Sequence, residues 1–193
     1  MKKLYELVSE LGLENTITLD DIPNIDLYMD QVTQLFENKY NEAKRNEDEK
    51  ILTKTMINNY AKAKLLFPIK NKKYSKEHLI LISLIYQLKG ALSISDVKVV
   101  LDRLNYKIEH EQLNLSELYV SHLELHDKSI ENFKANINVI SSDVNQEIDK
   151  KEDEDIEYLE SLLLISSLIN TSNMYRRLAE RLVDEMKEEP NKN

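Results

Sequence analysis

The sequence has no cysteine and very few of the residues that make turns. Without cysteine there is no disulfide, no thiolate nucleophile and no cysteine-based zinc site. Only 2 Gly and 3 Pro occur among 193 residues, whereas sheets and barrels draw heavily on both for their turns. Leu, Ile, Glu and Lys are abundant instead. The composition therefore predicts a mostly α-helical fold with long helices and few loops.

Long apolar runs are missing as well. A membrane-spanning helix needs roughly 20 consecutive apolar residues, and the longest candidate, residues 162–169, is interrupted by Ser166 and Ser167. The first residues carry charge and lead into no apolar run of signal-peptide length. A hydrophobic fraction of 41% with 32% charged residues is typical of a soluble globular protein. We therefore expect a cytoplasmic protein.

No motif of a catalytic or cofactor site is present. The sequence holds no Gly-rich phosphate loop and no HExxH motif. His122 and His126 lie one helical turn apart with acidic residues nearby, but no third ligand of suitable spacing follows. Because His122 also falls on an apolar stripe, a core or surface histidine is the simpler interpretation. We expect no enzyme, no catalytic residue, no metal and no cofactor.

Positive charge is concentrated in one part of an acidic chain. The formal net charge is −9, but residues 50–107 hold 12 Lys/Arg against 3 acidic residues. Residues 1–49 hold 5 Lys/Arg against 12 Asp/Glu, and residues 108–193 hold 9 against 20. Such a basic segment suggests a footprint for phosphates, whose neutralisation releases counterions. It is also compatible with packing of the basic segment against the acidic flanks.

Capping residues mark the expected helices of the first half. Asp20-Asp21-Ile22-Pro23 reads as the entry of a helix that buries Val32 and Phe36. Thr53 is a good N-cap for a helix to about residue 64, which the stretch 65–68 ends because its last residue is proline. Ser75 caps the next helix, and Ser93 with Asp96 has capping-box spacing for another. Residues 69–74 are a short extended or hairpin-like connection.

The second half of the chain is dominated by amphipathic patterns. From residue 115 to 148, apolar residues recur in alternating steps of three and four, as in a packed helix pair or short coiled coil. The longer step from Leu125 to Ile130 predicts a bend. A last helix follows an acidic loop. We expect an N-terminal helical domain over 1–107, with its basic core at 50–107, and a C-terminal dimerisation or interaction region over 108–193.

The order of the elements suggests a winged helix-turn-helix, in which one helix enters the major groove and a wing contacts phosphate. Asn binds an adenine edge through two hydrogen bonds, and Lys reaches guanine or phosphate. Asn is also a poor residue for a helix interior, so two in succession favour a functional role. The candidate DNA contacts lie on the expected reading helix, the connection after it and the next helix: Lys54, Asn58, Asn59, Tyr60, Lys62, Lys70, Lys72, Lys73 and Lys76.

Residues 55–60, the pair Leu65-Leu66 with Pro68, the run 72–77 and the run 92–97 resemble the DNA-binding domain of MerR-type regulators. The resemblance implies that Tyr60 and Lys72 touch the DNA backbone. It also implies that the C-terminal helices dimerise or hold the pocket of a small-molecule effector. The chain departs from the pattern, because the family's arginine is Asn58 and the glycine ahead of Leu-Leu is Lys64. A polar run, 41–50, replaces a tight turn.

The whole chain also resembles a bacterial family known as domain of unknown function 1836, mainly over residues 21–29 and 52–101. Taken together, the features predict a DNA-binding transcription regulator that binds duplex DNA and is a homodimer through residues 113–188. The alternative is a helical protein-interaction module on a helix-turn-helix scaffold that binds no DNA. Lysines sharing an exposed face would favour the first, and lysines paired with acids of residues 1–49 would favour the second.

Overall fold

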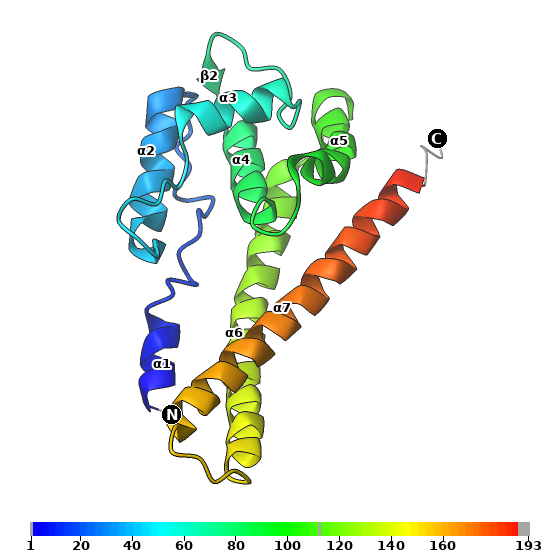
Figure 1. Ribbon diagram of the computed structural model, residues 1–193. Helices are drawn as coiled ribbons and strands as arrows, with labels where there is room; N and C mark the ends of the chain where they lie inside the picture. Colours follow the sequence, from blue (N-terminus) through cyan, green and yellow to red (C-terminus); the bar gives the residue numbers. More distant parts are fainter. Residues whose placement is uncertain (1, 112, 189–193) are drawn as a thin grey trace.

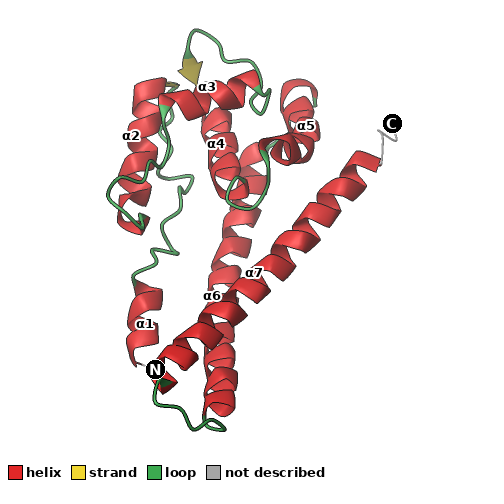
Figure 2. Cartoon of the chain, viewed as in Figure 1, coloured by secondary structure: helices red, strands yellow, loops and turns green. Residues whose placement is uncertain are grey.

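The computed structural model describes residues 2–111 and 113–188 and is mostly helical (Figures 1 and 2). The prediction of a mostly α-helical fold is thereby confirmed. The elements in chain order are α1 (Lys2–Ser9), β1 (Leu27–Tyr28), α2 (Met29–Tyr40), the 3₁₀ helix η1 (Asn41–Ala43), α3 (Lys54–Lys62), β2 (Lys73–Tyr74), α4 (Lys76–Leu88), α5 (Ile94–His110), α6 (Leu115–Ile148) and α7 (Ile156–Glu188).

Helix α4 forms the centre of the core. It is apolar on almost every side, as expected of a helix surrounded by other elements, and residues 78–83 and Ile85 are buried. Phe36 of α2, Ile57 of α3 and Val97 of α5 belong to the same core. Tyr119 of α6 joins them, and its hydroxyl donates a 2.6 Å hydrogen bond to the carbonyl oxygen of Ile17. The start of α6 is therefore part of the core around α4.

Helices α6 and α7 form a long antiparallel pair joined by the loop 149–155. Figure 1 shows them adjacent near this loop and diverging towards their other ends, where α7 approaches α5. There Val183 is buried, and Lys187 Nζ lies 2.9 Å from Asp96 Oδ1 at the start of α5. No helix within the described residues combines the length and apolarity needed to cross a membrane.

The break in the apolar pattern near residue 125 does not interrupt the helix. Helix α6 runs without interruption for 34 residues. Leu125, which was expected on the buried stripe, is exposed, whereas Ile130 is buried. The apparent break in the pattern therefore reflects an outward-facing leucine, and the helix itself keeps its regular period through this segment.

The predicted helix entry at residues 20–23 is wrong, because α2 begins only at Met29. The Asp21 carboxylate accepts a 2.8 Å hydrogen bond from the Thr18 backbone N–H and another from Lys39, so it closes a turn. Residues 27–28 are then extended, since β1 pairs antiparallel with β2. The side chain of Gln31 accepts a 2.8 Å bond from the Tyr28 N–H and satisfies the start of α2.

Candidate nucleic-acid interface

Helix α3 lies over the core with a polar face towards solvent. Its N-cap is Thr53, as predicted, and the Thr53 side chain accepts a 3.1 Å hydrogen bond from the Met56 N–H. Ile57 points into the core. Five side chains of the helix are exposed, in two neighbouring rows at four-residue spacing: Lys54, Asn58 and Lys62 in one row, Thr55 and Asn59 in the other. The candidate Lys and Asn residues of this helix are therefore exposed, whereas Ile57 and Tyr60 are buried.

The end of α3 is set by backbone hydrogen bonds and not by Pro68. The Leu65 N–H donates to the Tyr60 carbonyl (2.9 Å) and the Lys64 N–H donates to the Ala61 carbonyl (3.0 Å), which together form a Schellman motif. Lys64 occupies the left-handed position of this motif, with φ +58°. The prediction that the stretch 65–68 stops the helix is thus replaced by an earlier end, after Lys62.

Residues 70–73 form a hairpin turn. The Lys73 N–H donates a 3.0 Å hydrogen bond to the Lys70 carbonyl, and these two residues form an isolated antiparallel bridge. The two central residues, Asn71 and Lys72, both have positive φ, +54° and +59°. This is the arrangement of a type I′ turn. We call residues 70–73 the lysine hairpin; Lys70 and Lys72 are exposed on it.

The lysine hairpin and α3 lie at the same end of the molecule. Figure 1 shows both beyond the upper end of α4, far from the loop that joins α6 to α7. We call α3 together with residues 63–73 the lysine-rich end. It gathers six of the nine predicted contact residues on exposed positions, namely Lys54, Asn58, Asn59, Lys62, Lys70 and Lys72.

The remaining predicted residues are placed differently. Tyr60 is only 4% exposed and packs in the core, and burial raises the pKa of its phenol. It therefore lies among packing residues and not beside the exposed lysines. Lys73 is half-buried, with its ammonium 5.2 Å from the centre of the Tyr28 ring. Lys76, at the start of α4, is half-buried too.

Most of the exposed lysines at this end have no acidic partner. Lys54 forms an ion pair with Asp30 of α2, but both side chains are largely exposed, so the pair is weak. Across residues 2–111 and 113–188, no carboxylate forms an ion pair with Lys62, Lys64, Lys70 or Lys72. The packing of basic residues against acidic flanks thus accounts for Lys54, whereas Lys62, Lys64, Lys70 and Lys72 face solvent.

A histidine fixes the base of the lysine hairpin. His78 Nδ1 accepts a 3.1 Å hydrogen bond from the Ser75 N–H, which completes a capping box at the start of α4. Its Nε2–H donates to the carbonyl of Phe67, at 3.2 Å, and the two rings stack at 3.8 Å. The first of these contacts requires an unprotonated Nδ1 and therefore the neutral ring. Burial lowers the pKa of His78 and so favours that neutral form.

An asparagine of α5 holds the segment that follows α3. Asn105 is buried, and its side-chain amide donates hydrogen bonds to the carbonyls of Leu65 (3.0 Å) and Leu101 (3.1 Å). Leu65 and Leu66 are themselves buried. The backbone that carries Lys64 is therefore fixed from both sides, by the Schellman bonds and by Asn105.

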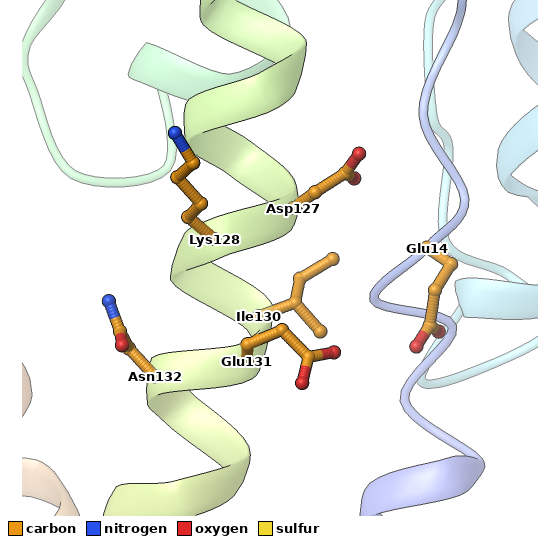
Figure 3. Close-up of a pocket in the computed structure, with 6 residues that line it drawn as sticks. All are labelled: Glu14, Asp127, Lys128, Ile130, Glu131 and Asn132. Carbon is orange, nitrogen blue, oxygen red and sulfur yellow. The ribbon is translucent and has the colours of Figure 1, made fainter.

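Two hollows of the surface lie away from the lysine-rich end. One of about 550 Å³ lies between α6 and the loop after α1. Figure 3 shows Glu14 on one side of it and Asp127 and Glu131 on the other, while Lys128 points away. Another, of about 330 Å³, lies between α1 and the far half of α6. Among the described residues, no group of three His, Cys, Asp or Glu side chains could hold a metal ion. Neither hollow is lined by the lysine-rich end.

The two histidines considered as metal ligands have packing roles. His122 Nε2 lies 2.8 Å from the Gln87 side-chain oxygen, and burial lowers its pKa. His126 Nε2 lies 3.1 Å from the Leu13 carbonyl. They connect α6 to α4 and to the N-terminal segment respectively.

Comparison with known proteins identifies the family. Residues 17–122 match the family described as "Domain of unknown function (DUF1836)". The chain belongs to this family, as its resemblance over residues 21–29 and 52–101 had indicated. The matched region runs from before β1 into the start of α6 and contains the whole lysine-rich end. No curated protein and no solved structure gives a significant match.

Proposed function

We propose that the protein is a DNA-binding transcription regulator that binds duplex DNA through its lysine-rich end. The observation that supports this most is the exposed face of α3, where Asn58 and Asn59 lie between Lys54 and Lys62. In a protein of net charge −9, unpaired lysines beside this face provide a local attraction for phosphates. The asparagines provide the hydrogen-bonding groups that distinguish adenine from other bases.

The order of elements supports a MerR-like winged helix-turn-helix arrangement for this region. Strand β1 precedes α2 and α3, the lysine hairpin follows, and β2 returns to pair with β1. In such an arrangement α3 is the reading helix and the lysine hairpin is the wing. Residues 41–53 between α2 and α3 are longer than a tight turn, but buried Ile51 and Leu52 attach this segment to the core.

The helix α7 provides a surface for the second copy that a palindromic operator requires. Large apolar side chains are 45–71% exposed along it in two groups, one on each side of the helix: first Tyr158, Leu162, Ile165 and Ile169, then Met174, Tyr175, Leu178, Leu182 and Met186. Soluble monomers rarely expose so many large apolar side chains along one element. A symmetric dimer would bury this same surface of both chains. We therefore propose a homodimer through α7, within the C-terminal region 108–193.

A helical interaction module that binds an acidic protein partner is the alternative. The ion pair between Lys54 and Asp30 favours this alternative, because here a carboxylate of the N-terminal segment binds a lysine of α3. The two functions differ in what the asparagines do. Sequence-dependent DNA binding needs Asn58, whereas attraction of an acidic surface needs only the positive charges.

The test compares three variants by fluorescence anisotropy with the protein's own promoter-region DNA and with random duplex. Lys72→Ala should weaken binding to both and flatten the plot of log K against log[salt] by about one unit. Asn58→Ala should lower the preference for promoter DNA over random duplex. Lys150→Ala, at the exposed loop after α6, is the control and should change neither. Equal losses on both DNAs for Asn58→Ala would contradict its proposed role.

A further inference from the structure

Three residues other than glycine have left-handed backbone in the described part of the chain, and all lie at the lysine-rich end. They are Lys64, Asn71 and Lys72, with φ between +54° and +59°. Asn tolerates this region comparatively well, but Lys does not. The chain uses glycine at another such position, Gly12 with φ +60°. Lysine thus occupies two positions where glycine would fit the backbone better.

The hydrogen bonds around each position define a turn type in which glycine is the usual residue. Lys64 is the residue after the C-cap of α3 in a Schellman motif, where glycine is the usual residue. Lys72 is the second central residue of the lysine hairpin, where Asn-Gly is the preferred pair for a type I′ turn. In both cases the side chain is exposed and forms no ion pair with a described residue. No ion pair with a described residue therefore explains why a lysine occupies either position.

Backbone strain that packing does not explain is concentrated at functional sites in proteins. We infer that Lys64 is a further phosphate-binding residue and that it acts together with Lys72, one at each end of the segment that connects α3 to β2. The ligand is the sugar–phosphate backbone of duplex DNA. This inference rests on the proposed function, and it adds Lys64, which lies outside the set predicted from the sequence.

The positions make a specific contact possible. Lys64 directly follows the reading face of α3, and Lys72 lies at the tip of the lysine hairpin. Asn105 and the Schellman bonds hold the backbone at Lys64, while the bridge between Lys70 and Lys73 holds it at Lys72. Each ammonium is thus carried on fixed backbone, which reduces the entropy lost when a phosphate is bound.

The test separates folding from binding, because the two effects of one substitution have opposite signs. In the full chain, Lys64→Gly should raise Tm by about 2 °C, since it removes the strain. It should also weaken binding to random duplex DNA several-fold and flatten the salt slope by about one unit. Lys64→Asn, which is neutral and tolerates left-handed backbone, should weaken binding equally. Lys64→Arg keeps the charge and should preserve both affinity and slope.

The outcomes distinguish the inference from the proposed function. If the wild type binds DNA with a steep salt slope and Lys72→Ala weakens it, but Lys64→Gly and Lys64→Asn bind as the wild type does, the role of Lys64 is overturned and the proposed function stands. A lower Tm for Lys64→Gly would overturn the strain argument. No DNA binding by the wild type at low salt would overturn the proposed function, and this inference with it.

Discussion

Truncation of one exposed leucine on α7 should dissociate the proposed dimer without disturbing the monomer. Leu178 is 60% exposed, so that share of its side chain leaves water only if a partner covers it. Leu→Ala removes three carbon atoms, each contributing about 0.8 kcal/mol when buried. Scaled by the exposed fraction, the loss is about 1.4 kcal/mol per chain. A two-fold axis repeats the substitution in the second chain, so the dimer loses about 3 kcal/mol of association free energy. The dissociation constant should therefore rise roughly 100-fold.

Sedimentation equilibrium of the wild type and the Leu178→Ala variant measures this change directly. Because Leu178 is exposed in the isolated chain, the variant's unfolding free energy as a monomer should change by less than about 0.5 kcal/mol. Asn170→Ala, at an exposed polar position of the same helix, is the matched control and should leave the dimer intact. A wild type that stays monomeric at high concentration, or a variant with the wild-type dissociation constant, would refute the role of α7.

Two further predictions concern the core and the hairpin base. Tyr119→Phe removes the hydrogen bond to the buried Ile17 carbonyl and should lower the unfolding free energy, measured by urea denaturation, by about 1–3 kcal/mol. The control is Tyr→Phe at exposed Tyr106, which should have no effect. A Tyr119→Phe variant as stable as the wild type would contradict the importance of this bond. The pKa of His78 is lowered in the folded protein by burial, so the unfolded chain takes up the proton first and stability should fall as pH drops below about 6.5. His78→Gln keeps a capping side chain and should reduce the pH dependence of the unfolding free energy between pH 7.5 and 5.5. Part of that dependence should remain, because the pKa of His122 is lowered too. An unchanged pH dependence would show that His78 is not the group responsible.

Local chemistry explains which parts of the fold could be predicted from the sequence. Thr53 and Ser93 accept hydrogen bonds from N–H groups three residues later, as expected of caps. Ser75 and His78 form the box that their spacing indicates. These features depend on neighbours along the chain, so the residues alone define them. The exposed Lys/Asn face of α3 was predictable for the same reason, since helical period fixes which side chains share a side.

Features that depend on distant segments could not be predicted in the same way. Strands of two residues are too short to show alternating apolar and polar residues, so the sequence pattern does not predict the pairing of β1 with β2. The late start of α2 depends on Asp21, which binds Lys39 eighteen residues away in place of capping a helix. The MerR resemblance implies that Tyr60 touches DNA, whereas in the structure its side chain is buried in the core. The sequence marks Lys64 only as a departure from the glycine of the MerR pattern, and its left-handed backbone depends on the hydrogen bonds at the end of α3.

DNA binding by the wild-type protein tests the central claim most directly. Fluorescence anisotropy with its own promoter-region DNA and with random duplex, over a salt series, gives both affinity and specificity. The unpaired lysines 62, 64, 70 and 72 predict a slope of roughly −4 per bound chain, at −0.9 for each phosphate neutralised. Tighter binding to promoter DNA with such a slope is the predicted result. No binding at low salt would contradict the account and leave the lysine-rich end as a surface for an acidic protein partner.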